Sequence, residues 1–245
     1  VTEKTIPALQ FDWCNYGGIT RDVNLVSVPE TYIRDYFVQL RQDDEKHLQV
    51  HIRLDGPSCA GRKVTLSIPE TGFKKDIITD ASGTASAIFK SKFELWSPEN
   101  PKLYEVNIST ASDTVADRIG FRTVRVQGED ILLNGKPVFL SGINIHEEIA
   151  SVRRRACTPA DARYLLGEAK SLGCNFVRLA HYPQNEYMVR LAEEMGFLMW
   201  EEIPVWQNIS LNDLDVRRRG ETMLNEMISR DKNRCGIIIW SVSNE

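Results

Sequence analysis

The second half of the sequence is built from apolar segments that alternate with amphipathic helical patterns. Four apolar runs have the length and composition of strands that are buried on both faces. They are residues 138–143, 176–180, 197–203 and 237–242. This alternation predicts a parallel sheet with right-handed crossovers, either a doubly wound fold or a (β/α)8 barrel.

Helical patterns separate these runs. The first is predicted to start at Thr158, a favoured N-cap residue, with Pro159 at the first helical position. Its apolar face is expected to comprise Leu165, Leu166, Ala169 and Leu172, before Gly173 ends the helix. Two more helices are predicted around residues 188–195 and 216–232.

Polar or charged side chains stand where each apolar run ends. They are Asn144 and His146, Arg178 and His181, Glu201 and Glu202, and Asn244 and Glu245. A barrel would bring all of them to one mouth, because the carboxyl ends of its strands open on the same face. A dinucleotide-binding fold would carry a GxGxxG turn after its first strand, and residues 141–144 lack one. We therefore predict a barrel, of which the first half is present.

Residues 31–125 show a different pattern, with short β-rich runs parted by turn residues. Examples of these runs are residues 36–40, 47–54, 64–68, 84–89 and 104–110. Leu48, Val50, Ile52 and Leu54 alternate with polar residues, which indicates a sheet with one buried face. A small antiparallel sandwich fits this span. Residues 1–30 hold too few apolar side chains to close a core and resemble the tail of a preceding β domain, which leaves residues 126–245 for the barrel.

Composition excludes several classes of function. A formal net charge of −4 gives no basic surface for nucleic acid, and the run Arg217, Arg218 and Arg219 fits the solvated start of a helix. The five cysteines lack CxxC spacing, which argues against a zinc site and a disulfide framework. The longest uninterrupted apolar stretch, residues 237–240, is far shorter than a membrane helix needs. We expect a soluble protein, with the bacterial cytoplasm, periplasm or exterior left open as its location.

Four segments resemble the motifs of one enzyme family. They are DWCNYGGITRDV (12–23), LLNGKPVFLSGINIHEE (132–148), NFVRLAHYPQNEYMVRLAEEMGFLMWEEIP (175–204) and RDKNRCGIIIWSVSNE (230–245). Together they resemble glycoside hydrolase family 2, which includes β-galactosidases, β-glucuronidases and β-mannosidases. The resemblance implies the end of a jelly-roll sugar-binding domain in residues 1–30, an immunoglobulin-like sandwich, and the first four βα units of a TIM barrel.

The resemblance also implies a reaction. Retaining hydrolysis needs two carboxyl groups about 5–5.5 Å apart, one to protonate the leaving oxygen and one to attack the anomeric carbon. Glu245 matches the family's acid/base, and the nucleophile of the family is a glutamate on a later strand, beyond this chain. The isolated chain is therefore expected to be inactive. Its last strand would be an unpaired edge that pairs with a complementing fragment or a second copy.

Further residues match family positions that bind substrate. Asn244 matches the residue that bonds the sugar 2-hydroxyl, while His146 and His181 match residues that bind hydroxyls or stabilise the oxocarbenium-like transition state. Asp12 matches an aspartate of both galactosidases and glucuronidases, so it does not choose the sugar. Arg178 matches an arginine that holds the nucleophile ionised. The remaining candidates are Trp206 and Trp240 as apolar platforms and Glu201 or Glu202 as a hydrogen-bonding support.

Three hypotheses follow from these residues. The leading one is a retaining exo-β-glycosidase that acts on a carbohydrate substrate, of β-galactosidase or β-glucuronidase type, with no required cofactor and magnesium possible near Glu245. The second is a non-catalytic carbohydrate-binding or structural fragment. The third is a metal-dependent barrel hydrolase, whose ligands would be His146, Glu147, His181 and Glu201. The absence of an HxH pair on the first strand weakens this third hypothesis.

Overall fold

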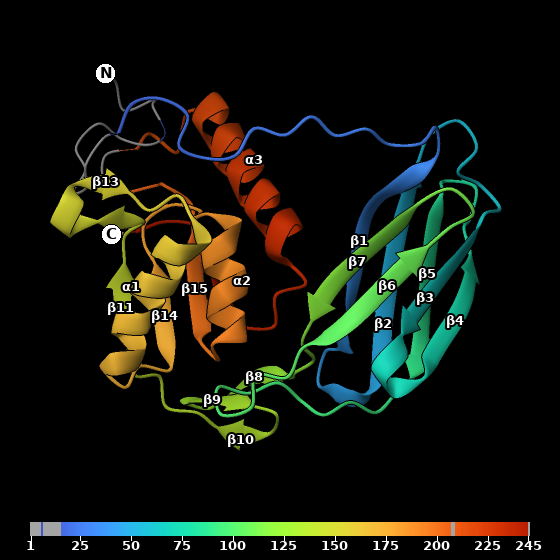
Figure 1. Ribbon diagram of the computed structural model, residues 1–245, viewed down its shortest axis with the longest axis horizontal. Coiled ribbons are helices and arrows are strands. Elements are labelled where there is room, and N and C mark those ends of the chain that lie inside the picture. Colours follow the sequence, from blue (N-terminus) through green and yellow to red (C-terminus); the bar gives the residue numbers. More distant parts are fainter. Residues whose placement is uncertain (1–5, 7–15, 207–208, 245) are drawn as a thin grey trace. The chain divides into compact units, whose positions relative to one another are not determined.

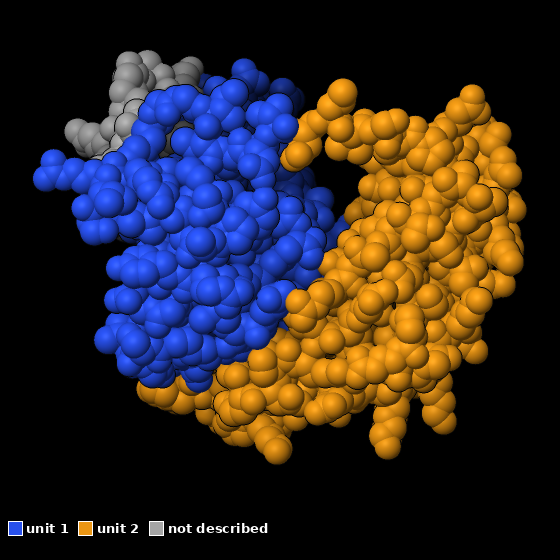
Figure 2. All heavy atoms as spheres, viewed as in Figure 1, with its two compact units in different colours: residues 1–23, 140–245 blue, residues 24–139 orange. Residues whose placement is uncertain are grey.

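The computed structural model describes residues 6, 16–206 and 209–244, and Asp12 and Glu245 lie outside them. The chain divides into two compact units (Figure 2). Unit 1 contains residues 1–23 and 140–245, and unit 2 contains residues 24–139. Each unit has its own hydrophobic core.

Unit 2 is a sandwich of two antiparallel sheets (Figure 1). The first sheet has the order β1-β2-β5, formed by β1 (Tyr32–Arg41), β2 (Asp44–Asp55) and β5 (Thr84–Lys90). The second has the order β4-β3-β6-β7, formed by β4 (Phe73–Ile78), β3 (Lys63–Ile68), β6 (Tyr104–Ser109) and β7 (Thr114–Ile119). A 3₁₀ turn, η1 (Pro69–Thr71), joins β3 to β4. A third, small sheet follows, with β8 (Val124–Gln127), β9 (Asp130–Leu133) and β10 (Lys136–Pro137).

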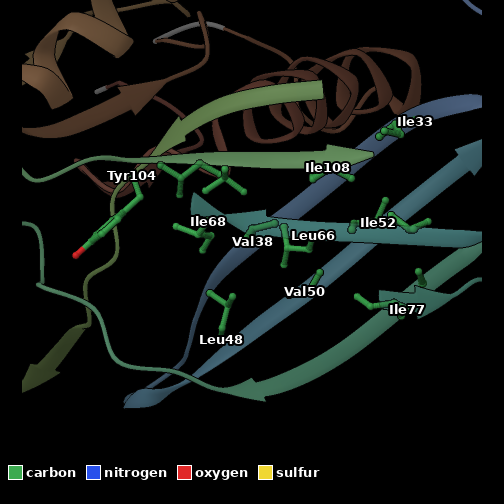
Figure 3. Close-up of a cluster of buried hydrophobic side chains, with 14 of the residues drawn as sticks. Ile33, Val38, Leu48, Val50, Ile52, Leu66, Ile68, Ile77, Tyr104 and Ile108 are labelled. Carbon is green, nitrogen blue, oxygen red and sulfur yellow. The ribbon is translucent and has the colours of Figure 1, made fainter. Parts of the chain in front are cut away.

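The core of unit 2 confirms the alternation predicted for β2. Leu48, Val50, Ile52 and Leu54 are all at most 2% exposed, and they pack with Leu66 and other apolar residues of the opposite sheet (Figure 3). Strands β4 and β7 were not predicted. In β4, Lys74, Lys75 and Asp76 interrupt the apolar pattern and only Ile77 is buried, which is typical of a charged edge strand.

Unit 1 contains a four-stranded parallel sheet whose strands are neighbours in chain order. The strands are β11 (Gly142–Ile145), β14 (Phe176–Leu179), β15 (Leu198–Glu202) and β16 (Ile237–Ser241). The helices are α1 (Pro159–Ser171), α2 (Glu186–Glu194) and α3 (Leu214–Asp231). A hairpin of β12 (Glu148–Ile149) and β13 (Arg154–Arg155), with the 3₁₀ turn η2 (Ala150–Val152), lies between β11 and α1. The sheet is open, and its four strands do not close into a barrel.

The α1 start is confirmed, because the Thr158 side chain accepts from the backbone of Asp161 in a capping box with Pro159 at the first turn. Two details were wrong. The first barrel strand begins at Gly142, and the stretch before it contains Phe139, which is 85% exposed. Leu172 is 68% exposed because the helix ends there and the chain turns at Gly173, where φ is +77°. Among the described helices, none has the length and apolar character needed to span a membrane.

Candidate active site

The polar side chains predicted to share a barrel mouth come from the same face of the parallel sheet. On β14, Val177 and Leu179 are buried against the helices, so alternation turns Arg178 to the opposite face. Arg178 lies level with Asn144 on β11 and with Trp200 on β15. The guanidinium carbon of Arg178 is 4.6 Å from the centroid of the Trp200 ring, which is a favourable cation–π distance.

Glu202 neutralises Arg178 at the end of β15. The Arg178 Nε donates to Glu202 Oε2 at 3.1 Å, and Nη2 donates to Oε2 at 2.7 Å and to Oε1 at 2.9 Å. The Glu202 side chain is 0% exposed and that of Arg178 is 18% exposed. Removing Arg178 would leave the fully buried Glu202 carboxylate without its charge partner, and breaking a buried pair in this way costs about 3–5 kcal/mol.

The same carboxylate fixes the tautomer of His181. The His181 Nδ1 lies 2.5 Å from Glu202 Oε1, and an ionised carboxylate only accepts hydrogen bonds, so Nδ1 carries a proton and donates it to this bond. The ring of His146 meets the ring of His181 edge-on, with centroids 5.3 Å apart and an interplanar angle of 74°. The structure therefore places both predicted histidines next to each other.

Asn244 is held at the end of β16 by two bonds. Its Oδ1 accepts from Arg178 Nη2 at 2.7 Å, and its backbone N–H donates to Val205 O at 2.8 Å. Trp206 forms an isolated parallel bridge with Asn244 and is 5% exposed. Trp240 packs against the apolar cores of unit 1.

The two consecutive glutamates of β15 point to opposite faces of the sheet. Glu201 lies on the helix side, with Oε1 3.5 Å from Arg230 Nη2 of α3, and it is 0% exposed. Burial, reinforced by the charge of Asp231, raises the pKa of Glu201 well above its ordinary value. Burial also raises the pKa of Asp231, although Arg230 opposes that shift. Glu202 is therefore the glutamate that supports the mouth.

The ligand set of the metal hypothesis is not brought together. Glu147 pairs with Arg21, with Nη2 to Oε2 at 3.1 Å, while Glu201 lies on the other face of the sheet. Within the part of the chain that the structure describes, no group of three or more His, Cys, Asp or Glu side chains could hold a metal ion.

Three side chains near the two histidines were not singled out from the sequence. The hydroxyl of Tyr182 accepts from Arg155 Nη1 at 2.7 Å and from the backbone N–H of Glu147 at 3.2 Å. Arg21 donates to Pro183 O at 2.7 Å as well as to Glu147. One signal in the sequence could have pointed to these side chains. Glu147, the acidic residue directly after His146, follows an otherwise apolar segment and would need a positively charged partner if it were buried.

Two models of one protein family match the chain. The model of glycosyl hydrolases family 2 matches residues 31–122, and the model of the family 2 TIM barrel domain matches residues 124–245. The chain belongs to glycoside hydrolase family 2. Its parallel sheet is accordingly the start of the family's TIM barrel domain.

Individual relatives of this family 2 chain are much longer than it is. A β-galactosidase of Arthrobacter sp. (strain B7) is 31% identical over 93% of this chain and 23% of its own length. A β-glucuronidase of Rattus norvegicus is 31% identical over 97% of this chain and 38% of its own length. The apo structure of Bacteroides uniformis β-glucuronidase 3 is 30% identical, with a TM-score of 0.84, over 100% of this chain and 32% of that chain. The chain spans less than half the length of each.

The raised pKa of Glu201 predicts how stability depends on pH. The folded chain keeps a proton on Glu201 that the unfolded chain releases above about pH 4.3, so the contribution of Glu201 to stability falls as pH rises. We expect Glu201→Gln to raise the melting temperature at about pH 8 and to change it much less at about pH 5.

Thermal unfolding at both pH values measures this difference, with Glu221→Gln on the exposed side of α3 as the matched control. The contrary result is a Glu201→Gln substitution that lowers the melting temperature more at about pH 8 than at about pH 5. It would mean that Glu201 is ionised in the folded state.

Proposed function

We propose that this chain carries the acid/base half of the active site of a retaining exo-β-glycosidase of the β-galactosidase or β-glucuronidase type. The observation that supports it most is the hydrogen-bonded cluster of Arg178, His181 and Asn244 around the buried Glu202, at the carboxyl ends of the parallel strands. Active sites of this barrel type lie at that end of the strands. The names of its relatives, β-galactosidase and β-glucuronidase, agree with this class of substrate.

Glu245 directly follows Asn244 and is the proposed acid/base. In the first step, its carboxyl proton passes to the glycosidic oxygen while a nucleophilic glutamate from a later strand, beyond this chain, bonds to the anomeric carbon. In the second step, the Glu245 carboxylate takes a proton from water, whose oxygen displaces the nucleophile. The sugar leaves with its β-configuration retained, and both carboxyl groups return to their starting states.

The contacts of Asn244 support its proposed role at the sugar 2-hydroxyl. Its Oδ1 is occupied by Arg178, so its amide N–H₂ group is the one that can donate to a hydroxyl of the sugar. A hydrogen bond to the 2-hydroxyl that strengthens in the transition state would contribute to kcat.

The remaining roles extend the same proposal. Arg178, already balanced by Glu202, would also hold the nucleophile ionised, and His146 and His181 would bind sugar hydroxyls. Asp12 would reach the pocket from a jelly-roll domain in residues 1–30, ahead of an immunoglobulin-like sandwich in residues 31–125 and the barrel from residue 126. Trp206, bridged to Asn244, would contribute an apolar edge.

Hydrolysis of nitrophenyl β-galactoside, β-glucuronide, β-mannoside and β-glucoside tests the proposal. We compare the 245-residue chain with a protein that continues through a complete barrel. We expect only the longer protein to turn over, because the proposed nucleophile is a glutamate on a later strand, and the preferred glycoside to name the sugar. Turnover by the 245-residue chain itself would show that the nucleophile lies within it.

The role of Glu245 is tested by its replacement with Gln in the longer protein. Proton donation matters most for aglycones that leave poorly, so kcat for a methyl or alkyl glycoside should fall by about 10²–10⁴-fold. The first step with a dinitrophenyl glycoside, whose aglycone leaves without a proton, should fall far less in single-turnover measurements. Equal losses on both substrates would remove the acid/base assignment.

A further inference from the structure

The carboxylate of Glu147 is buried beside the two histidines, and the proposed reaction does not use it. Its side chain is 2% exposed and follows His146 directly in the sequence. We propose that Glu147 is a positioning residue, which joins residues 16–23 and the loop 181–185 to the loop of His146 and thereby sets the placement of the His146 and His181 rings. The inference rests on the proposed function for its kinetic consequence only.

Both oxygens of Glu147 are engaged by segments that are distant in sequence. Arg21 Nη2 donates to Oε2 at 3.1 Å, and the backbone N–H of Asn185 donates to Oε1. The same Arg21 nitrogen also donates to Pro183 O at 2.7 Å. Arg21 and Glu147 therefore fasten residues 183–185, just after His181, to the residue just after His146.

The backbone of Glu147 makes a second set of hydrogen bonds between the same loops. The backbone N–H of Glu147 donates to the hydroxyl of Tyr182, the residue after His181, and the backbone of Ala156 donates to Glu147 O at 2.9 Å. The rings of Tyr182 and His146 are 6.2 Å apart between centroids. The residue after His146, Glu147, is thus hydrogen-bonded to the residue after His181, Tyr182.

The charge of Arg21 makes residues 16–23 part of this arrangement. A buried carboxylate is unfavourable unless a positive charge and hydrogen-bond donors compensate for it. Arg21 supplies the charge. Its neighbour Asp22 accepts a hydrogen bond from the Tyr187 hydroxyl at 2.5 Å, so two adjacent residues of this segment bond to the later part of unit 1. Without Arg21, the Glu147 carboxylate would lose its positive partner, and the two histidine loops would lose the attachment that runs through this carboxylate.

The test follows the histidine rings directly by NMR of their Cε1–H groups. The chain has four histidines, and His47 and His51 belong to unit 2, so they serve as internal references. We expect Arg21→Gln and Glu147→Gln to shift the His146 and His181 signals and to leave the references in place, with Arg21→Lys giving the smaller change. The control is Arg190→Gln, which removes an exposed pair with Glu186 on α2 and should move none of the four signals.

The kinetic arm uses the protein with a complete barrel. A displacement of about 1 Å at reacting groups can cost about 10²-fold in rate, so Arg21→Gln should lower kcat by that order with a smaller change in KM, and Arg21→Lys should restore part of it. If Glu147→Gln does not fold, Arg21→Gln alone is used for the test, because the Arg21 side chain is 40% exposed.

Unmoved His146 and His181 signals in Arg21→Gln would overturn the inference, as would an equal loss of kcat in Arg190→Gln. Should the complete protein hydrolyse no glycoside, the proposed function fails, and the NMR result still decides the role of Glu147.

Discussion

The arrangement of the mouth depends on one ion pair, between the partly buried Arg178 and the fully buried Glu202. A guanidinium on an interior strand is tolerated only when a carboxylate balances it, and Glu202 does so through three hydrogen bonds. Further hydrogen bonds from the two partners of this pair hold the neighbouring side chains. Arg178 holds the amide oxygen of Asn244, and Glu202 holds Nδ1 of His181. Two charges that compensate each other therefore orient the side chains of Asn244 and His181.

A second buried charge set lies on the other face of the same strand. Glu201, one residue before Glu202, faces Arg230 and Asp231 of α3. Arg230 also donates from Nη1 to Gln184 O, in the loop that follows His181. The strand β15 thus has charged groups on both faces. Glu202, at the mouth, is hydrogen-bonded to Arg178 and His181, while burial raises the pKa of Glu201 on the other face.

Much of the fold could be predicted because many of its strands carry their own local signal. The four apolar runs and their terminal polar residues indicated the parallel sheet, and Thr158 with Pro159 indicated where α1 starts. Strands β4 and β7 gave no such signal, because edge strands tolerate charged residues like Lys74 and Lys75.

The candidate site was predictable as a set of residues and not as a set of contacts. Arg178, His181 and Asn244 were identified because polar residues at the ends of parallel strands meet at one mouth and because they match family positions, and the structure brings them together around Glu202. The sequence could not show which of Glu201 and Glu202 faces the mouth. That depends on the register of β15, and two adjacent glutamates give no sign of it. The Arg21–Glu147 pair joins residues 126 positions apart and forms only when the chain has folded.

The most direct test of the account is the configuration of the sugar first released from a nitrophenyl β-glycoside by the protein with a complete barrel. Proton NMR recorded before mutarotation distinguishes the two anomers. Two carboxyl groups acting through a covalent intermediate predict that the β-anomer appears first. Initial release of the α-anomer would mean direct displacement by water, and it would contradict the assignment of this mouth to a retaining glycosidase.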